Sequence, residues 1–221
     1  MCGRFAQHTE VRAIRDLFEV AEGAPNLAPN WNLAPTQSAL VVRRHPETGA
    51  RHLDALRWGL VPRWAKDPKS VQNTINARAE TVATSRMYAP AFRQRRCLVP
   101  ADAYYEWEKT EDGKQPYAIA RSDGTPMAFA GLWEGWKDPE GSILRTFTII
   151  TTDAAPELRH IHDRMPVVLE RETWPVWLGE VDGGDVSLLL RPAEPGILHA
   201  WRVGRAVGSV RNNGPELLAP A

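Results

Sequence analysis

The chain has 221 residues, of which 43% are hydrophobic and 24% are charged, a composition typical of a soluble globular protein. Its 27 basic residues balance 27 acidic residues, which argues against blanket affinity for nucleic acid but allows a local basic groove. Two cysteines are too few for a disulfide framework and fit a reducing cytoplasm. Without a signal-peptide pattern or an apolar run approaching the roughly 20 residues of a membrane helix, we expect no membrane association.

The first predicted element is a helix. Thr9 can cap it, and Val11, Ile14, Leu17 and Phe18 then fall on one face at helical spacing. The following stretch, up to residue 37, is too rich in Pro, Asn and Gly for regular structure.

Most of the remaining signals indicate strands. Residues 38–44 and 51–60 flank a turn and predict a hairpin, and residues 96–109 predict two short strands with a bend at Pro100. Further strands are expected at 116–122, 127–136 and 144–152, and short helices at 155–162 and 171–179. This order favours one α+β domain over residues 1–221, with a mainly antiparallel, barrel-like or sandwich-like β core and peripheral helices.

Cys2 is placed where removal of Met1 would give it a free α-amine beside its thiol. The reference pKa values are about 7.7–8.0 for the amine and about 8.5 for the thiol, so both groups have reactive forms near neutral pH. The thiol could be an acyl-transfer nucleophile, or the amine could condense with an aldehyde before the thiol closes a thiazolidine ring. A plainer interpretation is a small residue that merely permits removal of Met1.

Three further segments carry candidate chemical groups. In "INARAET", Asn76, Arg78 and Glu80 alternate with small residues, as on a strand face that orients a carbonyl and holds an anion, or on an ordinary solvated face. In "AYYEWEK", Glu106 faces away from its aromatic neighbours, and in a cleft its raised pKa would suit a general acid. Solvent exposure is the commoner outcome for such a Glu.

The third segment is "HIHDRMPVVL". His162 could transfer protons near pH 7 and Arg164 could hold a phosphate, although a structural role is the commoner one for a lone histidine. The histidine spacing does not match a helical zinc site, so we expect no metal. Exposed tryptophans such as Trp64 near arginines are typical of platforms that stack single-stranded bases, while core packing is the default for most of the nine tryptophans.

Taken together, these segments resemble the SRAP family, the SOS-response-associated peptidase proteins. The resemblance rests on seven segments in the family's order across nearly the whole chain: "MCGRFAQ", "NWNLAPTQ", "RWGLVPRWA", "INARAETVATSRM", "RCLVPADAYYEWEK", "IHDRMPVVL" and "GRAVGSVRNNGPEL". One such motif would be weak evidence, but seven in order are specific. In the "RWGLVPRWA" segment, Trp64 precedes Ala65, where some members have a second tryptophan.

The resemblance implies a protein of the DNA damage response that binds single-stranded DNA and crosslinks covalently to an abasic site. Cys2 would form a thiazolidine with the C1′ aldehyde of the ring-opened sugar, and Asn76 would position Cys2 and the sugar. Glu106 would protonate or stabilise the sugar hydroxyl and imine, and His162 would assist ring opening and reversal. DNA-binding residues carried over from the resemblance are Arg4, Asn32, Pro35, Trp64, Arg78, Arg86 and Arg164, with Trp64 stacking on a base.

The resemblance further implies an abasic-site lyase side activity and autoproteolytic removal of Met1, the origin of the family's peptidase label. We expect no cofactor, a monomer, and a cytoplasmic protein that associates with the nucleoid when bound to DNA. Two alternatives stay open: a cysteine peptidase or N-terminal-nucleophile amidohydrolase that uses Cys2, and a non-catalytic single-stranded DNA-binding module.

Overall fold

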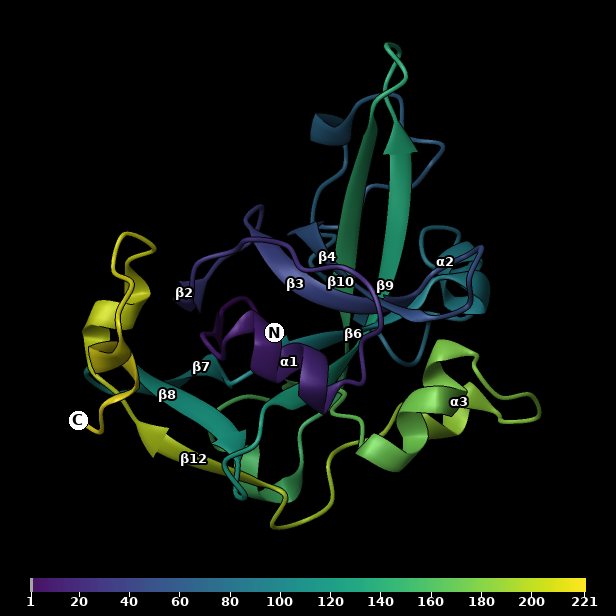
Figure 1. Ribbon diagram of the computed structural model, residues 1–221. Coiled ribbons are helices and arrows are strands. Elements are labelled where there is room, and N and C mark those ends of the chain that lie inside the picture. The colour runs from purple at the N-terminus through teal and green to yellow at the C-terminus, as the bar shows by residue number, and fades with distance from the viewer. Residues whose placement is uncertain (1) are drawn as a thin grey trace.

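The computed structural model describes residues 2–221, which form two β-sheets with short helices around them (Figure 1). One five-stranded sheet has the order β12-β8-β7-β1-β2 and consists of β1 (Phe5–Gln7), β2 (Asn30–Leu33), β7 (Ala103–Thr110), β8 (Gly113–Arg121) and β12 (Leu198–Arg202). The other sheet contains β3 (Ser38–Arg44), β4 (Arg51–Trp58), β5 (Asn76–Arg78), β6 (Arg96–Ala101), β9 (Met127–Lys137), β10 (Ile143–Asp153) and β11 (Arg164–Pro166).

The second sheet closes into a barrel of five strands, in the order β10-β4-β3-β6-β9, because β9 pairs with both β6 and β10. Gly131 lies at this double pairing, opposite Cys97 on one side and Ile149 on the other. A Cβ atom at Gly131 would lie 2.9 Å from the Cys97 Sγ atom, so the strands can approach this closely only at a glycine. The expected α+β fold with a barrel-like, mainly antiparallel core is confirmed.

Alternate side chains of the barrel strands enter two different apolar clusters. On β3, Ala39 and Val41 pack in a cluster that also holds Cys2 and the five-stranded sheet, whereas Leu40 and Val42 pack against the helices. Because β3 is buried on both faces, its sequence "SALVVRR" is a continuous apolar run rather than an alternating pattern. Cys2 thus lies between the two sheets.

Three α-helices cover the barrel: α1 (Val11–Leu17), α2 (Ala89–Gln94) and α3 (Trp174–Leu178). Shorter 3-10 turns complete the chain at η1 (Pro68–Ser70), η2 (Pro156–Leu158), η3 (Arg171–Thr173), η4 (Val186–Leu189), η5 (Arg205–Gly208) and η6 (Pro215–Leu218). The short helices predicted at 155–162 and 171–179 are therefore found as η2 and as η3 with α3. No helix within residues 2–221 has the length and apolar character needed to span a bilayer.

Three local predictions were wrong: strand β2 lies in the stretch up to residue 37 that was expected to lack regular structure, and the other two differ because of Asp102. Helix α1 starts after Glu10 rather than at a Thr9 cap, because the Thr9 hydroxyl donates to the Asp102 carboxylate. The break between β6 and β7 falls at Asp102 rather than Pro100, since the same carboxylate also accepts the backbone N–H groups of His8 and Thr9. Pro100 remains inside β6, where its carbonyl accepts from Gln7.

Candidate active site

Cys2 is fully buried just before β1, and its position is set from β5. Asn76, the first residue of β5, donates from Nδ2 to the Cys2 carbonyl at 2.8 Å. Strand β5 is held parallel to β10, and the Tyr88 hydroxyl donates to the Asn76 carbonyl at 3.2 Å. The Oδ1 atom of Asn76 is buried and has no hydrogen-bond partner among residues 2–221, so it remains available to a donor from a ligand.

Glu106 lies on β7 and is 4% exposed, so it is not the solvent-facing carboxyl that is commoner on such strands. It shares a strand face with Tyr104, two residues earlier, whereas Tyr105 and Trp107 pack in a separate cluster. Burial raises the pKa of the Glu106 carboxyl, as the sequence predicts for a cleft position. At neutral pH the group therefore holds a proton more readily than an ordinary Glu does.

The Cys2 thiol is close enough to Glu106 for their charges to interact. Burial, and then the negative charge of Glu106, raise the pKa of the Cys2 thiol. The pKa of Tyr104 is likewise raised, first by burial and then by the charges of Cys2 and Glu106. The thiol is consequently protonated at neutral pH, so any chemistry it performs needs a group that accepts its proton.

His162 lies in the segment between η2 and β11. Its Nδ1 atom accepts the backbone N–H of Arg164 at 3.0 Å, so the neutral ring carries its proton on Nε2. The same Nδ1 atom lies 2.8 Å from an Asp163 oxygen, which would pair with the ring in its protonated form.

Glu106 and His162 line a common cavity of about 420 Å³. These two residues were named from the sequence, but the others that line the cavity were not. Its other walls are Trp107, Lys109, Lys114 and Gly208. Lys109 and Lys114 are cross-strand neighbours at the end of the β7–β8 hairpin, and neither forms an ion pair with a described residue. The signal that could have found them is the pattern "KTEDGK", in which a tight turn brings two lysines together.

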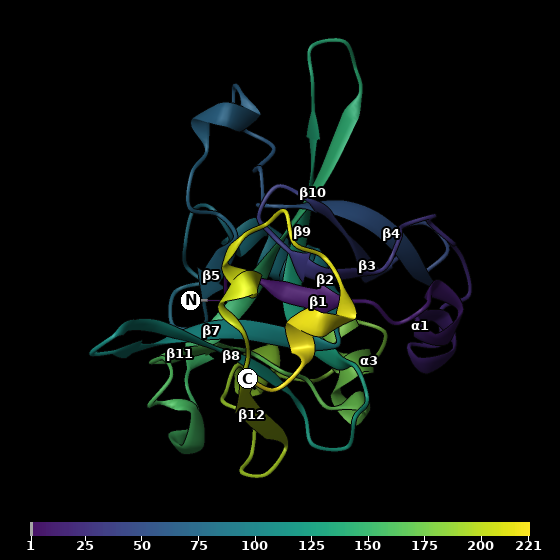
Figure 2. The same ribbon diagram turned by 90° about the vertical axis from the view of Figure 1, so that its left-hand side faces the viewer.

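Arg4 and Asn32 form hydrogen bonds to the C-terminal segment, which crosses over β1 and β2 (Figure 2). Asn32 is 1% exposed and donates from Nδ2 to the carbonyls of Val207, Ser209 and Asn212, while its Oδ1 atom accepts from Arg4 at 2.7 Å. Arg4 also donates to the Val207 carbonyl at 2.9 Å. Both residues thus hold the loop that contributes Gly208 to the cavity.

The other DNA-binding candidates occupy three different settings. Trp64 is 54% exposed, with the guanidinium of the exposed Arg86 located 5.4 Å from its ring centroid, and Arg78 is exposed at the end of β5. Pro35 is half-buried in the turn between β2 and β3. Arg164 instead donates to Glu80, Asp153 and the Thr151 carbonyl, so its guanidinium is already engaged.

Metal ligation finds no support in the part of the chain that the structure describes. No group of three or more His, Cys, Asp and Glu side chains within residues 2–221 is arranged to hold a metal ion. The cavity itself is lined by a buried carboxyl, that of Glu106, and the imidazole of His162.

The fold is shared with solved structures. It matches a protein from Bordetella bronchiseptica with a TM-score of 0.79 and 27% identity, over 92% of this chain and 100% of the other. A protein from Bacteroides thetaiotaomicron matches over the whole of both chains with a TM-score of 0.89, and at 21% identity this likeness concerns the fold alone.

Sequence comparison identifies the family. The model described as SOS response associated peptidase (SRAP) matches residues 1–210, and the chain belongs to this family. It is 39% identical to the Bacillus subtilis protein named "Abasic site processing protein YoqW", with 99% of each chain covered. It is also 37% identical to "Abasic site processing protein YedK" of Escherichia coli over 100% of both chains, and to "Abasic site processing protein HMCES" of Gallus gallus over 87% of this chain and 66% of the other.

Proposed function

We propose that this protein processes abasic sites in single-stranded DNA by forming a covalent thiazolidine between Cys2 and the aldehyde of the opened sugar. The observation that carries the proposal is the Asn76–Cys2 hydrogen bond of 2.8 Å, which holds Cys2 between the sheets, where the charge of Glu106 reaches its thiol. The names of the relatives supply the substrate class, since those proteins are named for abasic site processing.

The protonation states favour an order of steps in which the amine reacts first. Once Met1 is removed, the unprotonated amine of Cys2 adds to the C1′ aldehyde and gives a carbinolamine. Protonated Glu106 donates its proton to the hydroxyl, which leaves as water and produces an iminium ion. The Cys2 sulfur then closes on C1′, and its proton passes to the Glu106 carboxylate, so the carboxyl ends in its starting form.

His162 and Asn76 have supporting roles in this proposal. The Nε2–H group of neutral His162 is suited to donate a hydrogen bond to the ring oxygen of the closed sugar as the ring opens, and to the hydroxyl that this oxygen becomes, so it assists opening and reversal without losing its proton. The Oδ1 atom of Asn76, which has no partner among the described residues, is suited to accept a hydrogen bond from a sugar hydroxyl. Lys109 and Lys114 supply positive charge at the cavity for a phosphate beside the lesion.

The raised thiol pKa also distinguishes this proposal from a thiolate hydrolase. A cysteine peptidase or amidohydrolase relies on a thiolate stabilised by a nearby cation or helix terminus, whereas the surroundings of Cys2 disfavour the thiolate. Thiazolidine formation needs no free thiolate, because the iminium ion is a strong electrophile.

The test is to mix purified protein with a single-stranded oligonucleotide that carries one abasic site and to analyse the mixture on a denaturing gel. We expect a shifted band for the wild-type protein and for Cys97→Ala, the matched control at the other cysteine, and none for Cys2→Ala. A chain carrying an uncleaved N-terminal extension should also give no band, because a peptide nitrogen is not a nucleophilic amine. A full-strength band from Cys2→Ala would refute the proposal.

A further inference from the structure

A second, larger basic depression lies away from the cavity of Glu106 and His162, beside the ends of β3 and α2 and the strands β9 and β10. It consists of a cavity of about 600 Å³ and an adjoining one of about 490 Å³ that share four residues, among them Arg63 and Trp133. Figure 1 shows α2 and β7 on opposite sides of the barrel. We call it the arginine groove and define it by Arg44, Arg63, Arg93, Arg96, Trp133 and Arg145.

The positive charge of the groove is only partly compensated, because Arg63 and the lining residue Arg95 share Glu134 as their partner and Arg43 pairs with Asp54. Arg93, Arg145 and Lys137, another lining residue, form no ion pair with any residue in the range 2–221. Arg44 and Arg96 donate only to backbone carbonyls, which carry no net charge. Among the lining residues Glu47 is the one carboxylate, so the groove concentrates positive charge on a chain whose net charge is zero.

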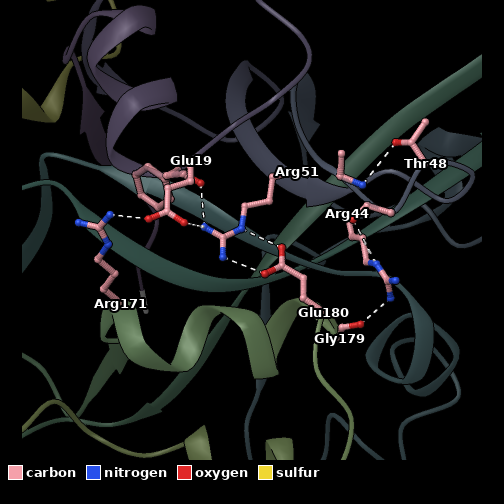
Figure 3. Close-up of polar contacts among 10 residues, drawn as sticks. Glu19, Arg44, Thr48, Arg51, Arg171, Gly179 and Glu180 are labelled. Carbon is pink, nitrogen blue, oxygen red and sulfur yellow. Dashed lines mark hydrogen bonds and ion pairs between the residues drawn. The ribbon is translucent and has the colours of Figure 1, made fainter.

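Some neighbouring arginines form ion pairs in which a carboxylate neutralises their charge. Arg51 forms a bidentate pair with Glu180, and Arg171 donates to Glu19, whereas Arg44 donates to the Gly179 carbonyl (Figure 3). Arg51 and Arg171 thus have carboxylate partners, as Arg63 of the groove has in Glu134. Arg44 has no carboxylate partner among residues 2–221, so its charge can pair with an anionic group of a ligand.

Glycine at position 179 keeps this wall of the groove open. Gly179 ends α3 in the left-handed conformation, with φ 72°, and a Cβ atom there would lie 3.2 Å from the Arg96 Nη2 atom. Its backbone carbonyl is also the acceptor for Arg44. One residue thus brings the guanidinium groups of Arg44 and Arg96 to the same wall.

A buried guanidinium at the floor of the groove carries an unused donor. Arg43 is 4% exposed and pairs with Asp54 through Nε, but its Nη1 atom is buried and has no hydrogen-bond partner among the described residues. The guanidinium carbon lies 4.7 Å from the centroid of the Trp133 ring. A cation and an aromatic ring that both line one cavity form the combination that holds a phosphate and stacks a base.

The groove is connected to the surface predicted to hold DNA. Arg63 lines it, and the next residue is the exposed Trp64, whose ring faces Arg86. Helix α2 then leads from the Arg86 side to Arg93, over a length on the order of 9 Å for its six residues. A strand that leaves Trp64 toward Arg63 therefore enters the arginine groove.

We propose that the arginine groove binds the phosphates of single-stranded DNA that flanks the lesion, beyond Trp64, with Trp133 stacking on a base. The inference rests on the proposed function, because a lesion held at Cys2 sets the direction in which the strand runs. Binding of phosphates by the groove does not depend on the crosslinking chemistry. It makes the groove a second anchoring site that lengthens the DNA footprint on one side of the abasic position.

The experiment measures binding of oligonucleotides that carry a stable tetrahydrofuran analogue of the abasic site, which cannot crosslink. The shortest strand reaches only Cys2 and the cavity of Glu106 and His162, and others are extended stepwise with thymidines on the 5′ or the 3′ side. We expect the wild-type affinity to rise by about tenfold at one extension length on one side, and to weaken as salt rises. The double variant Arg93→Glu, Arg145→Glu should lose this step, whereas Arg12→Glu, an exposed arginine on α1, should keep it.

The two substituted residues are exposed and make no side-chain hydrogen bond, so the double variant should unfold at the wild-type temperature. An affinity that does not depend on extension, or a step that survives the double charge reversal, overturns the inference. A step seen only with a double-stranded extension assigns the groove to duplex DNA and also overturns it. Crosslinking of the shortest true abasic strand is scored separately, so failure of the proposed function is recognised independently.

Discussion

At the scale of single residues, the environment of a side chain decides its chemistry more than its identity does. Glu106 and Glu108 lie two positions apart on β7, yet Glu106 is buried with a raised pKa, whereas Glu108 accepts a hydrogen bond from the Tyr117 hydroxyl at 2.9 Å. The alternation in "AYYEWEK" predicts which face Glu106 takes. It could not predict that Cys2 would lie within reach of that face, because the contact joins residues about a hundred positions apart.

Glu106→Gln tests the general-acid role at the same scale. Glutamine keeps the shape of the side chain but cannot donate a proton of carboxyl acidity, so we expect crosslinking to slow by roughly 10²- to 10⁴-fold. The raised pKa sets the pH dependence: the protonated carboxyl persists above the ordinary Glu range and is lost as pH rises further. The ratio of wild-type to variant rate should therefore fall as pH rises through that pKa.

The measurement is the single-turnover crosslinking rate of both proteins on one abasic oligonucleotide between about pH 5 and pH 9. Taking the ratio removes the titration of the amine, which both proteins share. A ratio that stays constant over this range would show that Glu106 does not act as the acid.

At the scale of elements, hairpins are the part of the fold that the sequence predicts best. The β3–β4 pair and strands β8, β9 and β10 were predicted from turn residues and apolar patterns, and they are confirmed. The parallel pairings of β10 with β4 and β5 were not predicted, because nothing local marks two distant strands as partners. The second of these pairings positions Asn76, so the site depends on a contact that local patterns do not encode.

Asn32 shows the same limit for a side chain. "NWNLAPTQ" marks Asn32 as a candidate DNA contact, but it is buried, and its amide holds a loop 175 to 180 residues later in the chain. We infer that it acts by positioning the loop that carries Gly208 rather than by touching DNA.

Asn32→Ala should therefore lower stability as well as function. Three backbone carbonyls and Arg4 lose a partner, and we expect the free energy of unfolding to fall by roughly 2 to 4 kcal/mol. Urea unfolding measures this, with Asn26→Ala, at an exposed position without a side-chain hydrogen bond, as the control. Protease cleavage within residues 205–213 should accelerate in Asn32→Ala only, and an unchanged cleavage rate would contradict the positioning role.

At the scale of the whole molecule, charge is distributed so that a neutral chain can present basic surfaces. The net charge of zero excludes a uniformly basic protein, yet it does not reveal that unpaired cations collect in the arginine groove and at Lys109 and Lys114. The sequence shows a cluster of arginines at Arg93, Arg95 and Arg96, but not whether they are only solvated or bind an anion. Its meaning depends on which arginines meet carboxylates, and only the tertiary structure determines that.

The same distinction holds for the site as a whole. Cys2, Asn76, Glu106 and His162 come from four separate segments, and sequence motifs nominate each of them without specifying a shared location. The structure joins Asn76 to Cys2 by a hydrogen bond, brings the charge of Glu106 to the Cys2 thiol, and sets Glu106 and His162 in one cavity. Their roles in catalysis remain predictions of the proposed mechanism.

The central claim is that the amine and thiol of Cys2 both bond to the abasic aldehyde carbon, and intact mass spectrometry of the adduct tests it most directly. The predicted mass is that of the protein without Met1 plus the oligonucleotide, less one water. The adduct should gain no hydrogen on borohydride treatment and should map to Cys2, because a closed thiazolidine has no reducible C=N bond. An adduct that retains Met1, that maps to a residue other than Cys2, or that is reduced by borohydride would contradict the account.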